Sequence, residues 1–584
     1  MKRITFIYLL FTFLFLASSC SKGSNSSPAP ASATVTSVKI STDKASYPPG
    51  STVTFTIDKA LPATAKVRYR HLSEVISETP LAGTTWQWQA PNQDFTGYMV
   101  DVYDVVNGKE VVYGSIGVDV SYDWSHFPRY GFLSSYPRMI TDAINYVINN
   151  LNRYHINGLQ FYDWEYEHNQ PLAGTPSQPD SIWQDIAKRN TYFSTIQGYI
   201  KAAHACNMKA MSYNLAYGAL SNAQQHGVSE KWYLFTDPNH LNKKVFKLDP
   251  SMFKSYIWVL DPSNPGWQQY IAGKTNDMYQ VYDFDGYHID QLGDLGTVYN
   301  YNGQQVNLPA GFESFIKAMK TYSPNKDLVM NAVNQFGQQD IAASPVDFLY
   351  TEVWGPNDGY KDLARIIENN NTYSNDTKKT VLTAYMDYNL ANNPGYFNTP
   401  GVIMTDAVIF AFGGDHLEMG EHMLGKEYFP NDNLKMKGNL RDAMVHYYDF
   451  LVAYENLLRD GGTLNNPQVT CTDGKITVNQ WPPQLGNVAV TGRDMGNKQV
   501  IHLLNYAGAN SLNWRDTNGT QTTPNPFTNV QLSYQTTKTV TKVWMASPDY
   551  EDGTPQNLNF TQDGNTITFT VPSLKYWDMV VVDY

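Results

Sequence analysis

The chain has 584 residues, which is long enough for two to four domains. A formal net charge of −12 argues against nucleic acid as a partner, because phosphate binding requires a basic surface. Three cysteines are too few for a disulfide-rich fold, and the 14% of aromatic residues suits either large β-domain cores or platforms for sugar rings.

The first segment has the pattern of an export signal. In MKRITFIYLLFTFLFLASSC, two basic residues precede an apolar run and three small residues, and Cys20 follows directly. This order predicts a signal peptide over residues 1–19 and resembles a bacterial lipoprotein signal, in which Cys20 is lipidated after cleavage. Residues 20–33 then form a flexible tether. We expect lipid anchoring to a bacterial membrane, with the outer membrane favoured; a plain signal peptide with a chance cysteine is the alternative.

Residues 34–122 alternate apolar and polar side chains between turn signals, as in STVTFTI (51–57) and GYMVDVYDVV (97–106). A strand places alternate side chains on opposite faces, so each such segment can bury one face. Short strands at this spacing predict an immunoglobulin-like β-sandwich, and we find no catalytic cluster in it.

From residue 123 to residue 469, strand-like and helix-like segments alternate. The eight strand candidates are 130–135, 157–164, 209–216, 284–290, 327–333, 347–354, 380–387 and 413–418. Eight β/α units of this kind predict a (β/α)8 barrel, whose active site lies at the carboxyl ends of the strands. The segment 217–264 is longer than most loops, so we expect it to form a wall of the cleft; a disordered loop is the alternative.

Alternation returns over residues 470–584, as in DMVVVDY (578–584), and predicts a second β-sandwich. The remaining cysteines, Cys206 and Cys471, fall in different predicted domains and have no clustered histidines, so we expect neither a disulfide nor a metal site. We expect a monomer that needs no cofactor.

The stretch FDGYHIDQLGD (284–294) carries the first candidate catalytic carboxylate. If it forms a strand, Tyr287 and Ile289 suit the side that faces the outer helices. Asp290 then faces the barrel axis as the last residue at the rim, whereas Asp294 lies beyond the strand in the loop. Asp290 is therefore the better candidate of the two.

The stretch FLYTEVWGP (348–356) carries the second carboxylate. Leu349 and Val353 suit the helix side of this strand, which turns Glu352 inward near the rim. Trp354 beside it could exclude water and raise the pKa of the Glu352 carboxyl, as a general acid requires.

Asp290 and Glu352 are thus predicted to face each other across one barrel mouth, as the nucleophile and acid of a sugar hydrolase do. A nucleophile must be ionised and an acid must hold its proton, so we expect a low pKa for Asp290 and a higher one for Glu352. The alternative is that both carboxylates are structural partners of arginine, lysine or backbone amides.

Other polar residues at predicted strand ends are candidates for binding sugar hydroxyls or for scaffold roles. They are Asp163, Trp164, Tyr213, Asn214, Asp415 and His416. Asp163 could accept a hydrogen bond and Trp164 could stack on a sugar ring, but the pattern leaves open which of the two points inward.

Six segments in order, QFYDWEYEH, SYNLAYG, FDGYHIDQLGD, TEVWGP, FGGDHLEMG and HYYDFLVAYENLLRD, resemble motifs of the dextranases of glycoside hydrolase family 66. The resemblance runs from the first predicted sandwich to the last. It implies a retaining endo-hydrolase of α-1,6-glucan such as dextran, with Asp290 as nucleophile and Glu352 as acid/base. It also places a set of residues around the sugar: Asp163, Trp164, Tyr213, Asn214, His288, Asp415 and His416. We expect Trp354, next to Glu352 on its strand, to bind substrate as well.

The same family contains transglycosylases that form cyclic dextrans, and these carry an additional carbohydrate-binding module late in the barrel. Here the corresponding connection, 388–400, is about a dozen residues long, which leaves no room for a module and favours hydrolysis. Two further alternatives stay open: a barrel glycosidase that acts on another α-glucan, and a catalytically silent, glucan-binding surface lipoprotein. Turnover of dextran would separate them.

Overall fold

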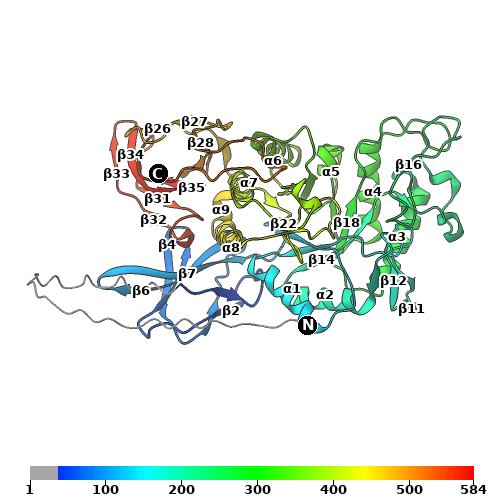
Figure 1. The fold of residues 1–584 in the computed structure, drawn as a ribbon, viewed down its shortest axis with the longest axis horizontal. Coiled ribbons are helices and arrows are strands. Elements are labelled where there is room, and N and C mark those ends of the chain that lie inside the picture. Colours follow the sequence, from blue (N-terminus) through cyan, green and yellow to red (C-terminus); the bar gives the residue numbers. More distant parts are fainter. Residues whose placement is uncertain (1–36) are drawn as a thin grey trace, which may run out of the picture. The chain divides into compact units, whose positions relative to one another are not determined.

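Residues 37–584 are described by the computed structural model (Figure 1). The predicted signal peptide, the tether and Cys20 lie outside these residues. Among residues 37–584, no helix is both long enough and apolar enough to cross a membrane.

Seven N-terminal strands form two antiparallel sheets, with orders β1-β2-β5 and β4-β3-β6-β7. Their bounds are β1 (Ile40–Thr42), β2 (Thr52–Ile57), β3 (Lys66–His71), β4 (Glu74–Pro80), β5 (Thr85–Gln89), β6 (Thr96–Val106) and β7 (Lys109–Val120). Inward side chains of the two sheets, among them Phe55, Tyr69 and Val100, share one apolar core. This arrangement follows from the alternation in the sequence, because every second residue of each strand faces the opposite sheet.

Eight parallel strands follow, and all eight lie within the predicted segments. They are β8 (Tyr130–Leu133), β9 (Gly158–Phe161), β14 (Lys209–Leu215), β18 (Gly286–Asp290), β19 (Asp327–Met330), β20 (Leu349–Glu352), β21 (Thr380–Thr383) and β23 (Asp415–His416). They belong to two open sheets, with orders β19-β18-β14-β9-β8 and β20-β21-β23. Single parallel bridges, Asn331 with Tyr350 and Phe132 with Gly420, connect the sheets on both sides. No sheet within the described part of the chain is closed, so the predicted closed barrel is not confirmed.

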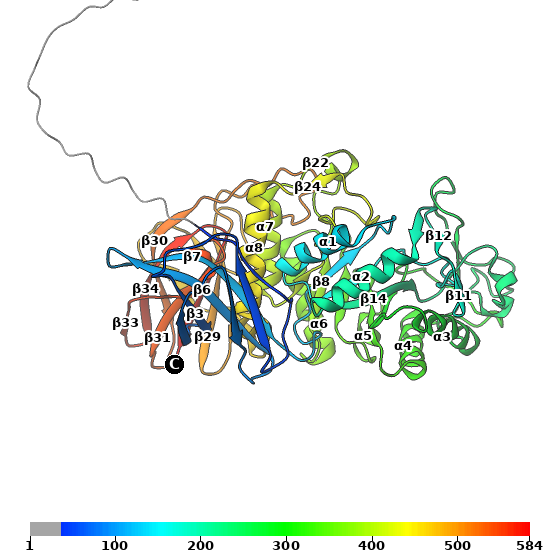
Figure 2. The same cartoon turned by 90° about the horizontal axis from the view of Figure 1, so that it is seen from below.

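Helices alternate with these strands (Figure 2). They are α1 (Thr141–Arg153), α2 (Phe193–Ala205), α3 (Pro265–Tyr279), α4 (Leu308–Tyr322), α5 (Gln338–Ala342), α6 (Tyr360–Ser374), α7 (Thr399–Ala411), α8 (Gly438–Ala453) and α9 (Glu455–Leu458). Local signals set their first turns: the Asn264 side chain accepts a hydrogen bond from the Gly266 amide at 2.9 Å, and Pro265 opens α3.

The long segment 217–264 contains a small sheet of order β15-β17-β16. The minor elements of the central region are β10 (Gly174–Thr175), β11 (Gln178–Pro179), β12 (Ile182–Gln184), β13 (Asn190–Tyr192), β15 (Gly218–Ala219), β16 (Val245–Phe246), β17 (Ile257–Val259), β22 (Gly395–Tyr396), β24 (Leu434–Lys435) and the 3-10 turns at Ala223–His226, Glu230–Trp232, Val333–Gln335 and Leu390–Asn392. The connection from β21 to α7 holds only one such turn and β22, so it contains no additional module.

The C-terminal strands form two sheets around a separate core that includes Val490, Leu532 and Val580. The larger has the order β25-β28-β29-β35-β31-β32, with β27 paired to β28, and the smaller the order β26-β30-β34-β33. The bounds are β25 (Thr463–Asn465), β26 (Val469–Cys471), β27 (Val478–Gln480), β28 (Val488–Asp494), β29 (Lys498–Asn505), β30 (Phe527–Gln535), β31 (Lys542–Ala546), β32 (Gln556–Asn557), β33 (Phe560–Asp563), β34 (Thr566–Leu574) and β35 (Trp577–Asp583). Contacts between the N-terminal, central and C-terminal regions make Ser37–Tyr584 one compact structural unit.

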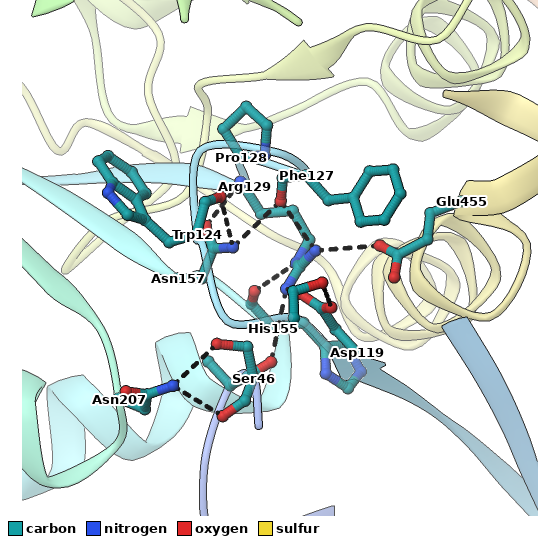
Figure 3. Close-up of polar contacts among 12 residues, drawn as sticks. Ser46, Asp119, Trp124, Phe127, Pro128, Arg129, His155, Asn157, Asn207 and Glu455 are labelled. Atoms are coloured by element: carbon teal, nitrogen blue, oxygen red, sulfur yellow. Dashed lines mark hydrogen bonds and ion pairs between the residues drawn. The ribbon is translucent and has the colours of Figure 1, made fainter. Parts of the chain in front are cut away.

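A buried guanidinium, that of Arg129, joins the N-terminal sheets to the central region (Figure 3). It donates to the Asp119 carboxylate of β7 at 2.7 Å and to the backbone carbonyl of His155, ahead of β9, at 2.7 Å. It also donates to Glu455 of α9 at 3.4 Å. Because Arg129 directly precedes β8, this cation ties the first strand of the parallel sheet to two other parts of the fold.

We predict that Arg129→Ala lowers the free energy of unfolding by about 3–5 kcal/mol, because it leaves two buried carboxylates without their cation. Urea denaturation measures the change. The matched control is Lys66→Ala, which breaks the exposed Lys66–Glu78 pair and should cost about 0–1 kcal/mol. Equal losses in the two variants would show that the Arg129 network does not hold the fold together.

Candidate active site

Asp290 and Glu352 are the last residues of β18 and β20. The predicted alternation is found in β18, where Tyr287 and Ile289 share an apolar cluster with Phe312 of α4. It is found in β20 as well, since Leu349 lies in that same cluster and Val353, just beyond the strand, packs with Leu363 of α6. Phe348 and Tyr350 lie instead in the cluster between the strands, with Tyr130 and Val329.

The two carboxylates share one hydrogen-bond donor, the side-chain amide of Asn331. Its Nδ2 donates to Asp290 Oδ1 at 2.8 Å and to Glu352 Oε2 at 3.0 Å. Its Oδ1 accepts a hydrogen bond from the Glu352 backbone amide at 3.2 Å. Because both oxygens lie so near one nitrogen, these two facing oxygens are closer together than the about 6.5–9.5 Å that separates the carboxyl groups of inverting glycosidases.

The other oxygen of each carboxylate accepts a hydrogen bond from a tyrosine. Tyr213 donates to Asp290 Oδ2 at 2.6 Å, and Tyr385 donates to Glu352 Oε1 at 2.7 Å. Among residues 37–584, no arginine, lysine or histidine forms an ion pair with either carboxylate. Both residues stay partly exposed. The described residues therefore give neither carboxylate an arginine or lysine partner, but the Gln291 backbone amide hydrogen-bonds to Asp290, which is the other kind of partner that our structural alternative named.

Burial is the main cause of the pKa shift at both carboxylates. It raises the pKa of Asp290, contrary to the low value that we expected, although hydrogen bonds from Tyr213 and Asn331 oppose the rise. The pKa of Glu352 rises to about 7, first through burial and second through the negative charge of Asp290. That second cause acts when Asp290 is already ionised. Glu352 therefore holds its proton below about pH 7, beside an ionised Asp290.

Two of the predicted binding residues lie beside the pair. Tyr213 bonds directly to Asp290. Trp354 is partly exposed, with its ring 5.2 Å from that of Tyr385. A third, Asp163, is buried, and its pKa is raised first by burial and then by the charge of Glu165, with Asp290 a smaller cause. Asp163 has a φ of 46°, the left-handed region that aspartate tolerates better than most residues.

Trp164 does not lie where a sugar ring could stack on it. Its side chain is fully buried, and its ring packs at 5.1 Å from Phe284 and 5.3 Å from Tyr282. Asn214 is buried too, and its side chain bonds to the imidazole and the backbone carbonyl of His168. Both expectations of a sugar contact fail for the same reason, since local packing occupies these side chains.

His288, Asp415 and His416 are also buried. The His288 imidazole stacks between Tyr130 and Tyr213 beneath the pair, and burial lowers its pKa to about 3. Asp415 accepts a hydrogen bond from the Tyr130 backbone amide at 2.9 Å, which ties β23 to β8. These three side chains are buried among the strands, which corrects our expectation that they reach sugar hydroxyls.

His416 lies in a buried polar cluster with Asp406 and Glu418. Its Nδ1 is 2.8 Å from Asp406 Oδ1 and 3.3 Å from Glu418 Oε2, and its Nε2 faces the Ala384 carbonyl at 3.0 Å. Within residues 37–584, these three residues are the one group placed closely enough to hold a metal ion together. Both ring nitrogens have protein partners, so the cluster supports β23 and links it to α7, although Asp406 Oδ2 and Glu418 Oε2 are buried without a hydrogen-bond partner.

Asn331 and Tyr385 were not predicted as site residues, although a usable signal existed for both. Each lies in the carboxyl-terminal part of a predicted strand segment, 327–333 or 380–387, and just beyond the strand that the structure has there. We selected polar residues at the ends of other strands and passed over this asparagine and this tyrosine. Tyr162 was also missed; its ring stacks on Phe429 at 4.3 Å and lies 5.0 Å from Tyr213.

Comparisons with known proteins agree on one family. The model of "Glycosyl hydrolase family 66" matches residues 42–581. A cycloisomaltooligosaccharide glucanotransferase of Niallia circulans is 28% identical, over 93% of this chain and 72% of its own. A dextranase of Streptococcus salivarius is 25% identical, over 89% and 72%. The crystal structure of a Paenibacillus sp. cycloisomaltooligosaccharide glucanotransferase complexed with cycloisomaltoheptaose matches with a TM-score of 0.86 at 25% identity, covering 94% of this chain and 99% of that one.

We predict that Asp290→Asn lowers the pKa of Glu352 from about 7 toward its ordinary value, because it removes the neighbouring negative charge. Carboxyl-carbon NMR of glutamate-labelled protein measures the titration, and Glu352→Gln identifies the signal. The matched control is Asp285→Asn, since Asp285 bonds to His204 and Lys209 and not to the pair. An unchanged Glu352 titration in Asp290→Asn would show that the two carboxylates are not coupled.

Proposed function

This chain belongs to glycosyl hydrolase family 66 and is a glycoside hydrolase, and from that premise we propose that it hydrolyses internal α-1,6-glucosidic linkages of dextran with retention of configuration. The observation that carries the proposal is the Asn331 amide, which holds two carboxylates together. A retaining pair requires a separation of about 5–5.5 Å, and the shared donor is compatible with that spacing. Asp290 is the proposed nucleophile and Glu352 the proposed acid/base.

In the first step, Glu352 gives its proton to the oxygen of the scissile glycosidic bond while the Asp290 carboxylate attacks the anomeric carbon. The bond to the leaving sugar breaks and a covalent glycosyl–Asp290 ester forms. Tyr213 and Asn331 hold the attacking carboxylate in place through two hydrogen bonds. A pKa of about 7 leaves about half of Glu352 protonated at pH 7 and nearly all of it protonated at lower pH, which is what a general acid needs.

In the second step, Glu352 must act as a base. Ester formation removes the negative charge of Asp290, and that charge is the second cause of the raised pKa of Glu352. The pKa of Glu352 therefore falls as the ester forms, which favours the carboxylate that the base step needs. Glu352 then takes a proton from water, the water oxygen attacks the anomeric carbon, and Asp290 leaves as a carboxylate.

The strands and partly exposed aromatic residues suit this chemistry. We propose that the two parallel sheets act as one (β/α)8 barrel, since bridges join them on both sides and the pair lies at the strand ends. Tyr162, Trp354 and Tyr388 form an aromatic rim near the carboxylates and are proposed sugar contacts. The proposed domains are 34–122, 123–469 and 470–584, preceded by the lipid-anchored segment that begins at Cys20.

Formation of cyclic dextrans by transglycosylation is the second candidate, because relatives at 28% identity carry that name. Two observations favour hydrolysis. The alignment with one such relative spans 702 positions, more than the 584 residues of this chain, so that relative contains segments that this chain lacks. The connection between β21 and α7 also holds no module. Without additional sugar-binding surface, water is the favoured acceptor for the glycosyl ester.

We predict that Glu352→Ala slows hydrolysis of dextran by about 10²–10⁴-fold, because the leaving alcohol needs a proton. An aryl isomaltoside, whose leaving group departs unaided, should lose far less in the glycosylation step. Pre-steady-state rates on both substrates give the comparison. The matched control is Asp294→Ala, a loop carboxylate that accepts a hydrogen bond from the Gly296 amide and should leave both rates unchanged.

Two results would contradict the proposal. Equal losses on both substrates in Glu352→Ala would remove Glu352 from the acid role. Wild-type protein that degrades pullulan or starch but not dextran would move the substrate to another α-glucan, and cyclic products from dextran would assign it to the transglycosylases.

A further inference from the structure

We infer that Arg515, which the C-terminal β-region contributes, is a positioning residue for Glu352. The inference rests on the proposed function, in that Glu352 is taken as the acid/base. Arg515 does not touch either carboxylate in the contacts of the described residues. It acts through the backbone next to Glu352 and through Tyr385.

Arg515 lies in the connection between β29 and β30, and this connection is fixed by its neighbours. The Trp514 indole is fully buried, and its Nε1 donates to the Asn357 carbonyl at 2.7 Å. The Trp514 backbone amide donates to the Asp358 carbonyl at 2.9 Å. On the other side, the Asp516 carboxylate accepts hydrogen bonds from the backbone amides of Thr520 at 2.7 Å and Gln521 at 3.1 Å. It also accepts one from the Asn398 side-chain amide at 2.6 Å. Arg515 is thus held between two anchored residues.

The guanidinium of Arg515 bridges two strand ends. Its Nη2 donates to the Val353 carbonyl at 3.0 Å and its Nη1 to the Tyr385 carbonyl at 3.3 Å. Its Nε donates to the Asp358 carboxylate at 3.1 Å, and this bond fixes the orientation of the guanidinium. The residue is 8% exposed, and its guanidinium lies over the Trp514 ring at 4.5 Å. Five donors in one plane allow an arginine to hold several acceptors at once, and a lysine cannot reproduce this geometry.

Both carbonyls belong to residues that control the acid/base. Val353 directly follows Glu352, and the Tyr385 hydroxyl donates to Glu352 Oε1 at 2.7 Å. The strands end just before these residues, at Glu352 in β20 and at Thr383 in β21. Among residues 37–584, the donor to each of the two carbonyls is Arg515. The guanidinium therefore connects the two chain segments just beyond the point where β20 and β21 stop.

Loss of this bridge has a defined electrostatic consequence. The hydrogen bond from Tyr385 stabilises the ionised form of Glu352 and so lowers its pKa. If the Tyr385 backbone is released, that bond weakens and the pKa of Glu352 rises above about 7. Because the acid is active when protonated, the high-pH limb of the activity profile moves upward while the turnover at the optimum falls.

The charge of Arg515 could produce a similar shift without any positioning, and a substitution by lysine separates the two explanations. A lysine at this position would keep the positive charge but could not donate hydrogen bonds to the Val353 and Tyr385 carbonyls at the same time. A positioning role therefore predicts that Arg515→Lys behaves like Arg515→Met, and a purely electrostatic role predicts that Arg515→Lys behaves like wild type.

The experiment compares Arg515→Lys and Arg515→Met with wild type in the full-length protein, on dextran, across pH. We expect kcat to fall by up to about 10²-fold, as for a small misplacement of a catalytic group, with KM changed less than kcat and the high-pH limb shifted upward. Tyr385→Phe should shift the limb in the same direction, and its combination with Arg515→Lys should be less than additive. Thermal unfolding of each variant is recorded in parallel.

The matched control is Arg493→Lys. Arg493 is a buried arginine of β28 that donates to the Gly461 carbonyl at 2.8 Å, so its loss should lower the melting temperature and leave the pH profile in place. If Arg515→Met does not fold, Asp358→Asn serves instead. It removes only the partly exposed carboxylate that pairs with the Arg515 guanidinium, so it should shift the high-pH limb in the same direction by a smaller amount.

An unchanged pH profile in Arg515→Lys, with losses of activity no larger than in Arg493→Lys, would overturn the inference and leave Arg515 a packing residue. Failure of the proposed function is a separate result, seen as full activity on dextran in Asp290→Ala and Glu352→Ala.

Discussion

The candidate site depends on one side chain, that of Asn331. Its amide nitrogen donates to carboxylates from two different strands, while its oxygen accepts the Glu352 backbone amide. Asn331 also forms the bridge with Tyr350 that joins the five-stranded sheet to the three-stranded one. Asn331 therefore takes part through its backbone in one of the two bridges between the sheets, and through its side chain in the hydrogen bonds that hold the acidic pair. If this seam opened, Glu352 would lose the Asn331 donor, whereas Asp290, on the neighbouring strand of the same sheet, would keep it.

Two buried arginines attach the flanking β-regions to the parallel strands. Arg129 connects β7 to the start of β8, on the side of the strands' amino ends, and Arg515 connects the β29–β30 connection to the carboxyl ends of β20 and β21. A buried guanidinium must have several partners, which makes each junction specific in geometry. The flanking regions thus contribute to the rigidity of the site as well as to the buried apolar surface, which accounts for their presence around a chemistry carried by two strands.

The sequence predicted most of what depends on periodicity. The eight parallel strands, the direction of Tyr287 and Ile289, and the placement of Asp290 and Glu352 at strand ends all follow from alternation of side chains. Roles set by long-range packing were not predictable in this way. Trp164 and His416 lie in matching motifs yet are buried by residues distant in sequence, and Asn331 and Arg515 gain their importance from partners that only the folded chain brings near. The connection between the two open sheets is likewise a property of a few bridges.

The central claim is that Asp290 forms a covalent bond with the sugar, and trapping that ester tests it most directly. A fluorosugar with an activated leaving group, extended by one α-1,6-linked glucose, should form the ester faster than water can cleave it. Digestion and mass spectrometry should then find the added sugar on the peptide that contains residues 284–294, at Asp290, and not in Asp290→Asn. A label on Asp163 or another carboxylate, or turnover of dextran with inversion and no adduct, would contradict the account.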